Sequence, residues 1–139
     1  MRRSLMINLL GEPKMGLDMY AWVVDKNDGN GEFTIAEDIE KGELAYWRKF
    51  NALHGWMQNL YRSKGGAAES FNCIPVRLTV EDLMSLQADA MNNRLTPTPG
   101  FFFGDQSIYP EDIESTLEFV GKALAAITNG KEVYYDSWW

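Results

Sequence analysis

The sequence contains very little cysteine and histidine. Among its 139 residues, Cys73 is the only cysteine and His54 the only histidine. A lone cysteine excludes an intramolecular disulfide and a cysteine-rich zinc site, and one histidine cannot by itself form a zinc site. We therefore expect a chain suited to a reducing compartment, with no bound metal and no cofactor.

Positive charge is also scarce. The chain has 13 lysines and arginines against 20 aspartates and glutamates, and its formal charge is −7. Because general nucleic-acid binding depends on neutralising phosphates, this balance argues against it. The apolar stretch within residues 1–10 imitates a signal peptide only loosely, since residues 11–14 offer no small-residue cleavage site. We expect a cytoplasmic protein that does not bind membranes.

Signatures of common enzymes are missing as well: the sequence has no Gly-x-Ser-x-Gly elbow and no Walker loop. It does have a hydrophobic fraction of 45%, a charged fraction of 24% and an aromatic fraction of 13%. These values are typical of one folded globular domain that is rich in stacking side chains.

Hydrophobic periodicity predicts an α+β fold. Residues 15–24 and 32–36 favour two strands joined by a turn at 25–31, and residues 131–139 favour a C-terminal strand. Helices are expected over residues 44–61, after the N-cap Thr79 to about residue 94, and from Pro110 to Asn129 and Gly130. The economical arrangement is a small antiparallel sheet that joins both ends of the chain, with about three helices packed on it.

The expected helix at 44–61 has two stripes. One stripe suits the core, and its members are Tyr46, Phe50, Leu53, Met57 and Leu60. The second carries Trp47, Asn51 and His54 beside the cations Arg48 and Lys49. Rings that flank amide and imidazole donors suit a purine base, and a guanidinium suits a phosphate. A structural histidine and a solvated cationic face remain the alternatives.

Aromatic side chains elsewhere could form the walls of the same site. We expect Tyr20 and the loop residues Phe101, Phe102 and Phe103 to do so, because Pro99, Gly100 and Gly104 bracket these rings with loop-forming residues. Core filling is the alternative for the three phenylalanines.

Residues 28–37 match an EF-hand calcium loop from its third to its twelfth position. Asp28, Asn30 and Glu37 would supply oxygens and Gly31 the turn, but Lys26 stands where the first ligand is required. A strand also precedes the loop where the motif needs a helix. The turn of a hairpin is therefore the favoured interpretation, with calcium as the alternative.

Four short motifs of the sequence, in the order in which they occur, are similar to those of a known family. They are MGLDMY from Met15, YWRK from Tyr46 with Asn51, His54 and Trp56, PGFFFG from Pro99, and YY from Tyr134 with Ser137 and Trp138. The order resembles that of small phage-encoded and prophage-encoded proteins of unassigned function. The resemblance begins at Met15, which implies an N-terminal extension at 1–14 and a single domain at 15–139.

That resemblance implies a phage accessory protein, working in the host cytoplasm. Our leading hypothesis is a non-enzymatic binder that sequesters a nucleotide-like ligand of host defence. The first alternative is an acidic protein–protein inhibitor of a host nucleic-acid-processing or defence enzyme, supported by the acid-rich stretch 25–43. An enzyme using His54 with Asp18 or Asp136 comes third, and exposed aromatics make a homo-oligomer plausible.

Overall fold

The computed structural model describes residues 16–26, 31–96 and 107–139, and it has the expected α+β architecture. Four strands form one antiparallel sheet in the order β2-β1-β4-β3. They are β1 (Asp18–Asp25), β2 (Gly42–Arg48), β3 (Val76–Leu78) and β4 (Lys131–Trp138). The two central strands come from opposite ends of the chain and pair along their whole length, from Asp18 with Trp138 to Asp25 with Lys131. The predicted sheet that joins both chain ends is confirmed.

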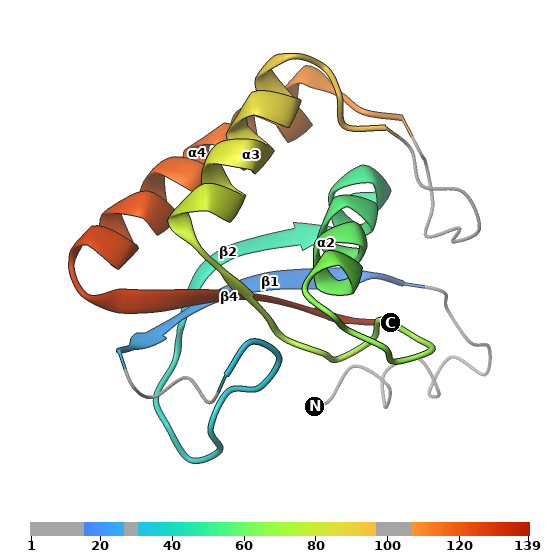
Figure 1. Cartoon of the computed structure of the whole chain (residues 1–139). Helices are drawn as coiled ribbons and strands as arrows, with labels where there is room; N and C mark the ends of the chain where they lie inside the picture. Colours follow the sequence, from blue (N-terminus) through green and yellow to red (C-terminus); the bar gives the residue numbers. More distant parts are fainter. Residues whose placement is uncertain (1–15, 27–30, 97–106) are drawn as a thin grey trace, which may run out of the picture.

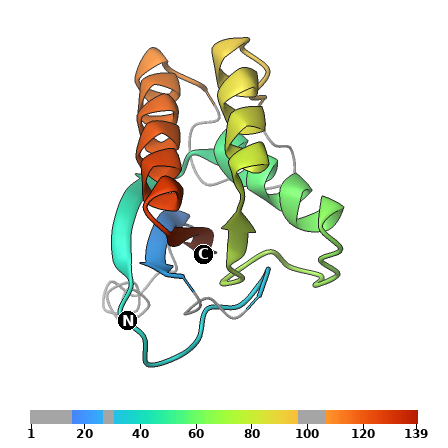
Figure 2. The same ribbon diagram turned by 60° about the vertical axis from the view of Figure 1, so that its left-hand side comes forward.

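The helices of the described part all lie on one face of this sheet (Figure 1). They are α2 (Asn51–Ser63), α3 (Val80–Met91) and α4 (Pro110–Thr128). Figure 2 shows α3 and α4 side by side and running in opposite directions. None of the described helices is long and apolar enough to span a membrane.

Local signals set several helix ends as predicted. The Thr79 hydroxyl accepts from the Asp82 amide and the Asp82 carboxylate accepts from the Thr79 amide, a complete capping box. Pro110 opens α4, and Gly130 follows that helix with a φ of 84°, in the left-handed region that glycine favours.

The prediction of a helix from residue 44 is wrong, because residues 42–48 form the edge strand β2 beside β1. Lys49 has a φ of 59°, and its amide donates to the Leu17 carbonyl at 2.8 Å, so the chain turns there and helix α2 begins at Asn51. The expected strand at 32–36 is reduced to a single bridge at Ile35. The hairpin partner of β1 is thus β2, at the end of a longer connection. Strand β3 was not predicted, since only three residues pair with β4.

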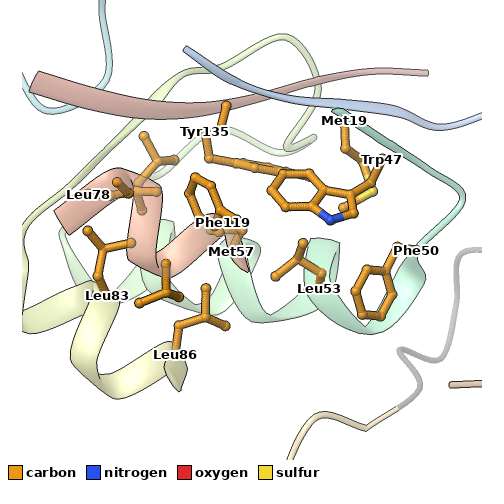
Figure 3. Close-up of a cluster of buried hydrophobic side chains, with 14 of the residues drawn as sticks. Met19, Trp47, Phe50, Leu53, Met57, Leu78, Leu83, Leu86, Phe119 and Tyr135 are labelled. Atoms are coloured by element: carbon orange, nitrogen blue, oxygen red, sulfur yellow. The ribbon is translucent and has the colours of Figure 1, made fainter. Parts of the chain in front are cut away.

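The core fills the space between the helices and the facing side of the sheet. Figure 3 shows Met19, Trp47 and Tyr135 reaching from the strands toward Leu53 and the other helical side chains. Strand alternation sends these residues to one face and their neighbours to the other. The residues of α4 that reach deepest into this core are Thr116, Phe119, Val120 and Ala123.

Candidate functional site

The face of the sheet that none of the described helices covers, called here the helix-free face, carries polar and aromatic side chains in place of an apolar layer. Since Met19, Ala21 and Trp47 point to the core, the alternate residues of β1 and β2 point away from the helices. They are Asp18, Tyr20, Trp22, Tyr46 and Arg48. Asp136 and Trp138 belong to the same face, because they pair across β1 with Tyr20 and Asp18.

One carboxylate oxygen organises the centre of this face. Oδ1 of Asp18 accepts a hydrogen bond from the Tyr46 hydroxyl at 2.6 Å and one from Nη1 of Arg48 at 2.9 Å. The Asp18 side chain is only 4% exposed, whereas that of Arg48 is 48% exposed. Partial burial and the hydrogen bond to Asp18 raise the pKa of Tyr46 above its ordinary value. The phenol therefore stays neutral, and the guanidinium is held with one edge toward solvent.

Aromatic rings line up beside this ion pair. Tyr20 stacks on Trp22 with ring centroids 5.1 Å apart and planes 11° apart, and it contacts Tyr46 at 5.3 Å. Nζ of Lys41 lies 4.5 Å from the centroid of the Trp22 ring, a cation–π contact. Tyr46 is 46% exposed, so much of its ring surface is accessible.

These side chains surround a shallow depression of about 440 Å³. Its described lining consists of Asp18, Tyr20, Glu43, Tyr46 and Arg48. A volume of this order accommodates a small molecule. Two carboxylates and one guanidinium line the depression, so its polar groups are net acidic despite the cation.

Gly16, just before β1, makes room for Arg48. A methyl group added at Gly16 would lie 3.1 Å from Nη2 of Arg48. A side chain at this position would therefore push on the guanidinium that borders the depression.

Asp136 contributes a further carboxyl group to the face. Its Oδ1 accepts from the amide of Ser137 at 2.8 Å. Burial raises the pKa of Asp136 to about 6, while the Ser137 amide and the charge of Lys41 act in the opposite direction. This carboxyl group therefore titrates slightly below neutral pH.

The structure brings together two of the predicted site residues, Tyr20 and Arg48. Lys49, half-buried, forms the turn that follows. The expectation that Tyr46 belongs to the core is wrong, because it points to the helix-free face beside Arg48. Alternation over residues 44–48 is the signal that would have indicated this, since Ala45 and Trp47 fit one face of a strand and Tyr46 and Arg48 the other.

The predicted site, in which Trp47, Asn51 and His54 share a face beside Arg48, does not form. Trp47 is 8% exposed, packs edge-on against Phe119 and donates from Nε1 to Ser115 at 3.2 Å. Asn51 is 3% exposed. A strand ending at Arg48 and a helix starting at Asn51 direct these side chains into the core, on the side of the sheet away from Arg48. Phe101, Phe102 and Phe103 lie outside the described residues.

His54 is a core residue on the inner face of α2. It is 1% exposed, its Nδ1 lies 2.7 Å from the Tyr135 hydroxyl, and its ring stacks on Phe71. Burial lowers the pKa of His54 to about 4, so the imidazole is neutral at physiological pH. This geometry matches the structural alternative for the histidine.

A second depression, of about 390 Å³, lies between α2 and the end of α3. Asp89 is one of its lining residues, and its carboxylate accepts hydrogen bonds from Nε1 of Trp56 at 2.8 Å and from Nε of Arg94 at 2.9 Å. The hydrogen bond from Trp56 and the contact with Arg94 lower the pKa of Asp89. The indole N–H and the guanidinium are thus engaged with Asp89.

Three of the ten residues in the calcium-loop match, 28–30, lie outside the described part of the chain, and they include Asp28 and Asn30. Strand β1 precedes it, and Glu37 is exposed. Within the described ranges, no group of three or more histidine, cysteine, aspartate or glutamate side chains could hold a metal ion.

The fold and this face define a small α+β protein with an open, acid-lined aromatic depression on one side of its sheet. No family model, curated protein or solved structure matches the sequence significantly.

Proposed function

We propose that the depression on the helix-free face binds a small nucleotide-like ligand, and that the chain acts by holding this ligand without converting it. The observation that carries the proposal is the exposed ring of Tyr46 beside the exposed guanidinium of Arg48, both attached to one oxygen of Asp18. A base stacks on such rings, at about 1–3 kcal/mol per base, and a guanidinium pairs with a phosphate.

Preorganisation favours binding at this position. Asp18 is buried and fixed in β1, so the Tyr46 hydroxyl and the Arg48 guanidinium have a common anchor. Side chains that are already held lose little conformational entropy when a ligand arrives. The stacked pair of Tyr20 and Trp22 gives the adjoining wall a fixed orientation.

Binding without turnover fits the position of the only histidine. His54 lies in the core, on the opposite side of the sheet from the depression, and it is bonded to Tyr135. The described residues that line the depression supply two carboxylates, two phenols and a guanidinium. They supply stacking and polar contacts, and none of them is a serine, threonine, cysteine, lysine or histidine.

The biological setting follows from the motif resemblance to phage-encoded proteins. In that setting, a protein that holds a nucleotide tightly would remove a signalling nucleotide of host defence from solution. This role requires affinity alone, which an anchored aromatic and cationic depression can provide.

Calorimetric titration and thermal unfolding with a panel of nucleosides, mononucleotides and cyclic nucleotides test the proposal. A ligand at ~100 times its dissociation constant should stabilise the fold by about 2.7 kcal/mol. Mass spectrometry of the ligand released by heat should return it unchanged. A changed mass would contradict a holding role, and no stabilisation by any member of the panel would overturn the proposal.

Three variants locate the site. Tyr46→Ala removes the stacking ring, and Arg48→Lys keeps the charge beside Asp18 but removes the planar fork that pairs with phosphate. Each should weaken binding by about tenfold or more. Arg94→Ala is the matched control in the depression between α2 and α3, and it should bind like the unmodified protein. Loss of binding in Arg94→Ala alone would move the site there.

The acidic connection between β1 and β2 supports a second candidate, the inhibitor that occludes a basic host enzyme. Glu37, Asp38 and Glu40 in this connection are exposed, and so is Glu43 near the start of β2. Glu32 pairs with Lys64. Affinity capture with the unmodified chain and with a variant carrying lysine at 37, 38 and 40 tests this candidate. Partners lost on reversal would support it, and identical partners would contradict it.

A further inference from the structure

The charges around the depression restrict the ligand that it can accept. Arg48 is the one cation among the described lining residues, and Asp18 and Glu43 are both acidic. Nη1 of Arg48 already donates a hydrogen bond to Asp18. Lys41 is not among the described lining residues, and its Nζ lies over the Trp22 ring. A ligand with several phosphates would therefore bring more negative charge than this site can balance.

These groups follow one another along the sheet edge. On β2, Arg48 pairs with Asp18 and Tyr46 with Tyr20, and after a register shift that leaves one extra residue on β2, Glu43 pairs with Trp22. The cation and the exposed carboxylate are thus at opposite ends of the depression, roughly 15 Å apart along the strand, with the rings between them. A ligand that lies on the rings meets a cation at one end and an acceptor at the other.

We infer that the ligand is a nucleoside monophosphate whose base carries an amino group, with its phosphate at Arg48 and the donor edge of its base at Glu43. The inference rests on the proposed function and adds the ligand's charge, its orientation and the class of its base. A carboxylate only accepts hydrogen bonds, so it selects a base edge that donates. A single phosphate matches a single guanidinium.

The charge requirement is tested by titrating adenosine, AMP, ADP and ATP at low and at physiological salt. AMP should bind more tightly than adenosine, and ATP about fivefold more weakly than AMP at low salt, because the added phosphates meet the acidic lining. Added salt should reduce the penalty for ATP. Affinity that rises from AMP to ATP would overturn the inference and leave the proposed function intact. Absence of binding by every nucleotide would remove the proposed function itself.

The base requirement is tested with AMP and GMP against purine riboside monophosphate, whose base has neither an amino group nor any other N–H donor. The amino-bearing pair should bind about fivefold or more tightly. Glu43→Gln should reduce this preference and also the penalty for ATP, since an amide both donates and accepts and carries no charge. Glu114→Gln is the matched control, because it removes the same charge from α4 on the opposite side of the sheet. Equal effects of the two variants would contradict a direct role of Glu43.

Discussion

Nδ1 of His54 on α2 lies 2.7 Å from the Tyr135 hydroxyl on β4, and this pair joins helix and sheet inside the core. The imidazole therefore interacts with the helix-covered side of the sheet, while Arg48 and Tyr46 face the other side. Tyr46 and Arg48 on β2 and His54 on α2 therefore lie on opposite sides of the sheet, although they are close in the sequence.

The first prediction concerns pH and His54. Its pKa is about 4 in the folded protein and 6.5 ordinarily, so the unfolded chain binds the proton more tightly. The contribution of His54 to stability is complete above pH 6.5 and falls as the pH drops toward 4, by about 3 kcal/mol. Urea unfolding across this range should show the loss in the unmodified protein and a smaller one in His54→Gln. Equal slopes would contradict the burial of a neutral imidazole.

The second prediction concerns Asp136, for which the sign is reversed. Its pKa is raised from 3.8 to about 6, so the folded protein binds the proton more tightly. The associated stability is present below pH 3.8 and is lost as the pH rises through 6. Asp136→Asn, which imitates the protonated group, should be more stable at neutral pH by about 2 kcal/mol, as measured by urea unfolding. If Asp136→Asn is less stable than the unmodified protein at neutral pH, the raised pKa of Asp136 is contradicted.

The third prediction concerns the start of α3. Thr79→Ala removes the hydroxyl that accepts from the Asp82 amide at 3.1 Å, and it should lower the free energy of unfolding by about 1 kcal/mol. Thr79→Ser retains the oxygen and is the control. Chemical unfolding of both variants compares them directly, and similar losses would show that the hydroxyl is not the stabilising group.

The fourth prediction concerns two glycines with opposite surroundings. Gly121, inside α4, has no atom within 4 Å of an added methyl group, so Gly121→Ala should stabilise the protein by about 1 kcal/mol. An added methyl at Gly66 would lie 2.2 Å from Cε1 of Tyr61, whose buried ring stacks on Phe71. Gly66→Ala should therefore destabilise by about 1–3 kcal/mol. Thermal unfolding of the pair provides the measurement.

The fifth prediction links Gly16 to the proposed site. Gly16→Val should displace Arg48, whose Nη2 lies 3.1 Å from the added Cβ position, and should weaken AMP binding. We expect a loss of about three- to tenfold, because a displaced guanidinium pairs poorly with phosphate. Unfolding measurements on the same variant should show a change within about 1 kcal/mol, since the guanidinium tip can move into solvent. Unchanged affinity would separate the binding surface from Arg48.

Local signals in the sequence were sufficient for the fold class and for several element ends. The capping box of Thr79 and Asp82 and the proline at the start of α4 act within a few residues, so their effect does not depend on distant neighbours. The apolar and aromatic composition of 15–24 likewise predicts a strand. For the site, Tyr20 and Arg48 were among the predicted residues.

The segment around Arg48 could not be assigned from its pattern. Tyr46 and Phe50 are four residues apart, which suits one face of a helix, but Ala45 and Trp47 also alternate as in a strand. Pairing with β1 decided between these possibilities, because the backbone of residues 42–48 forms its hydrogen bonds with a neighbouring strand.

The sequence by itself determined a small α+β chain that is rich in aromatic side chains, poor in metal-binding groups and capped at defined helix ends. Only the tertiary structure decided which of those aromatics are accessible. The alternation of an edge strand sends Trp47 into the core and Tyr46 and Arg48 out to Asp18, and this choice of face depends on a partner strand distant in sequence.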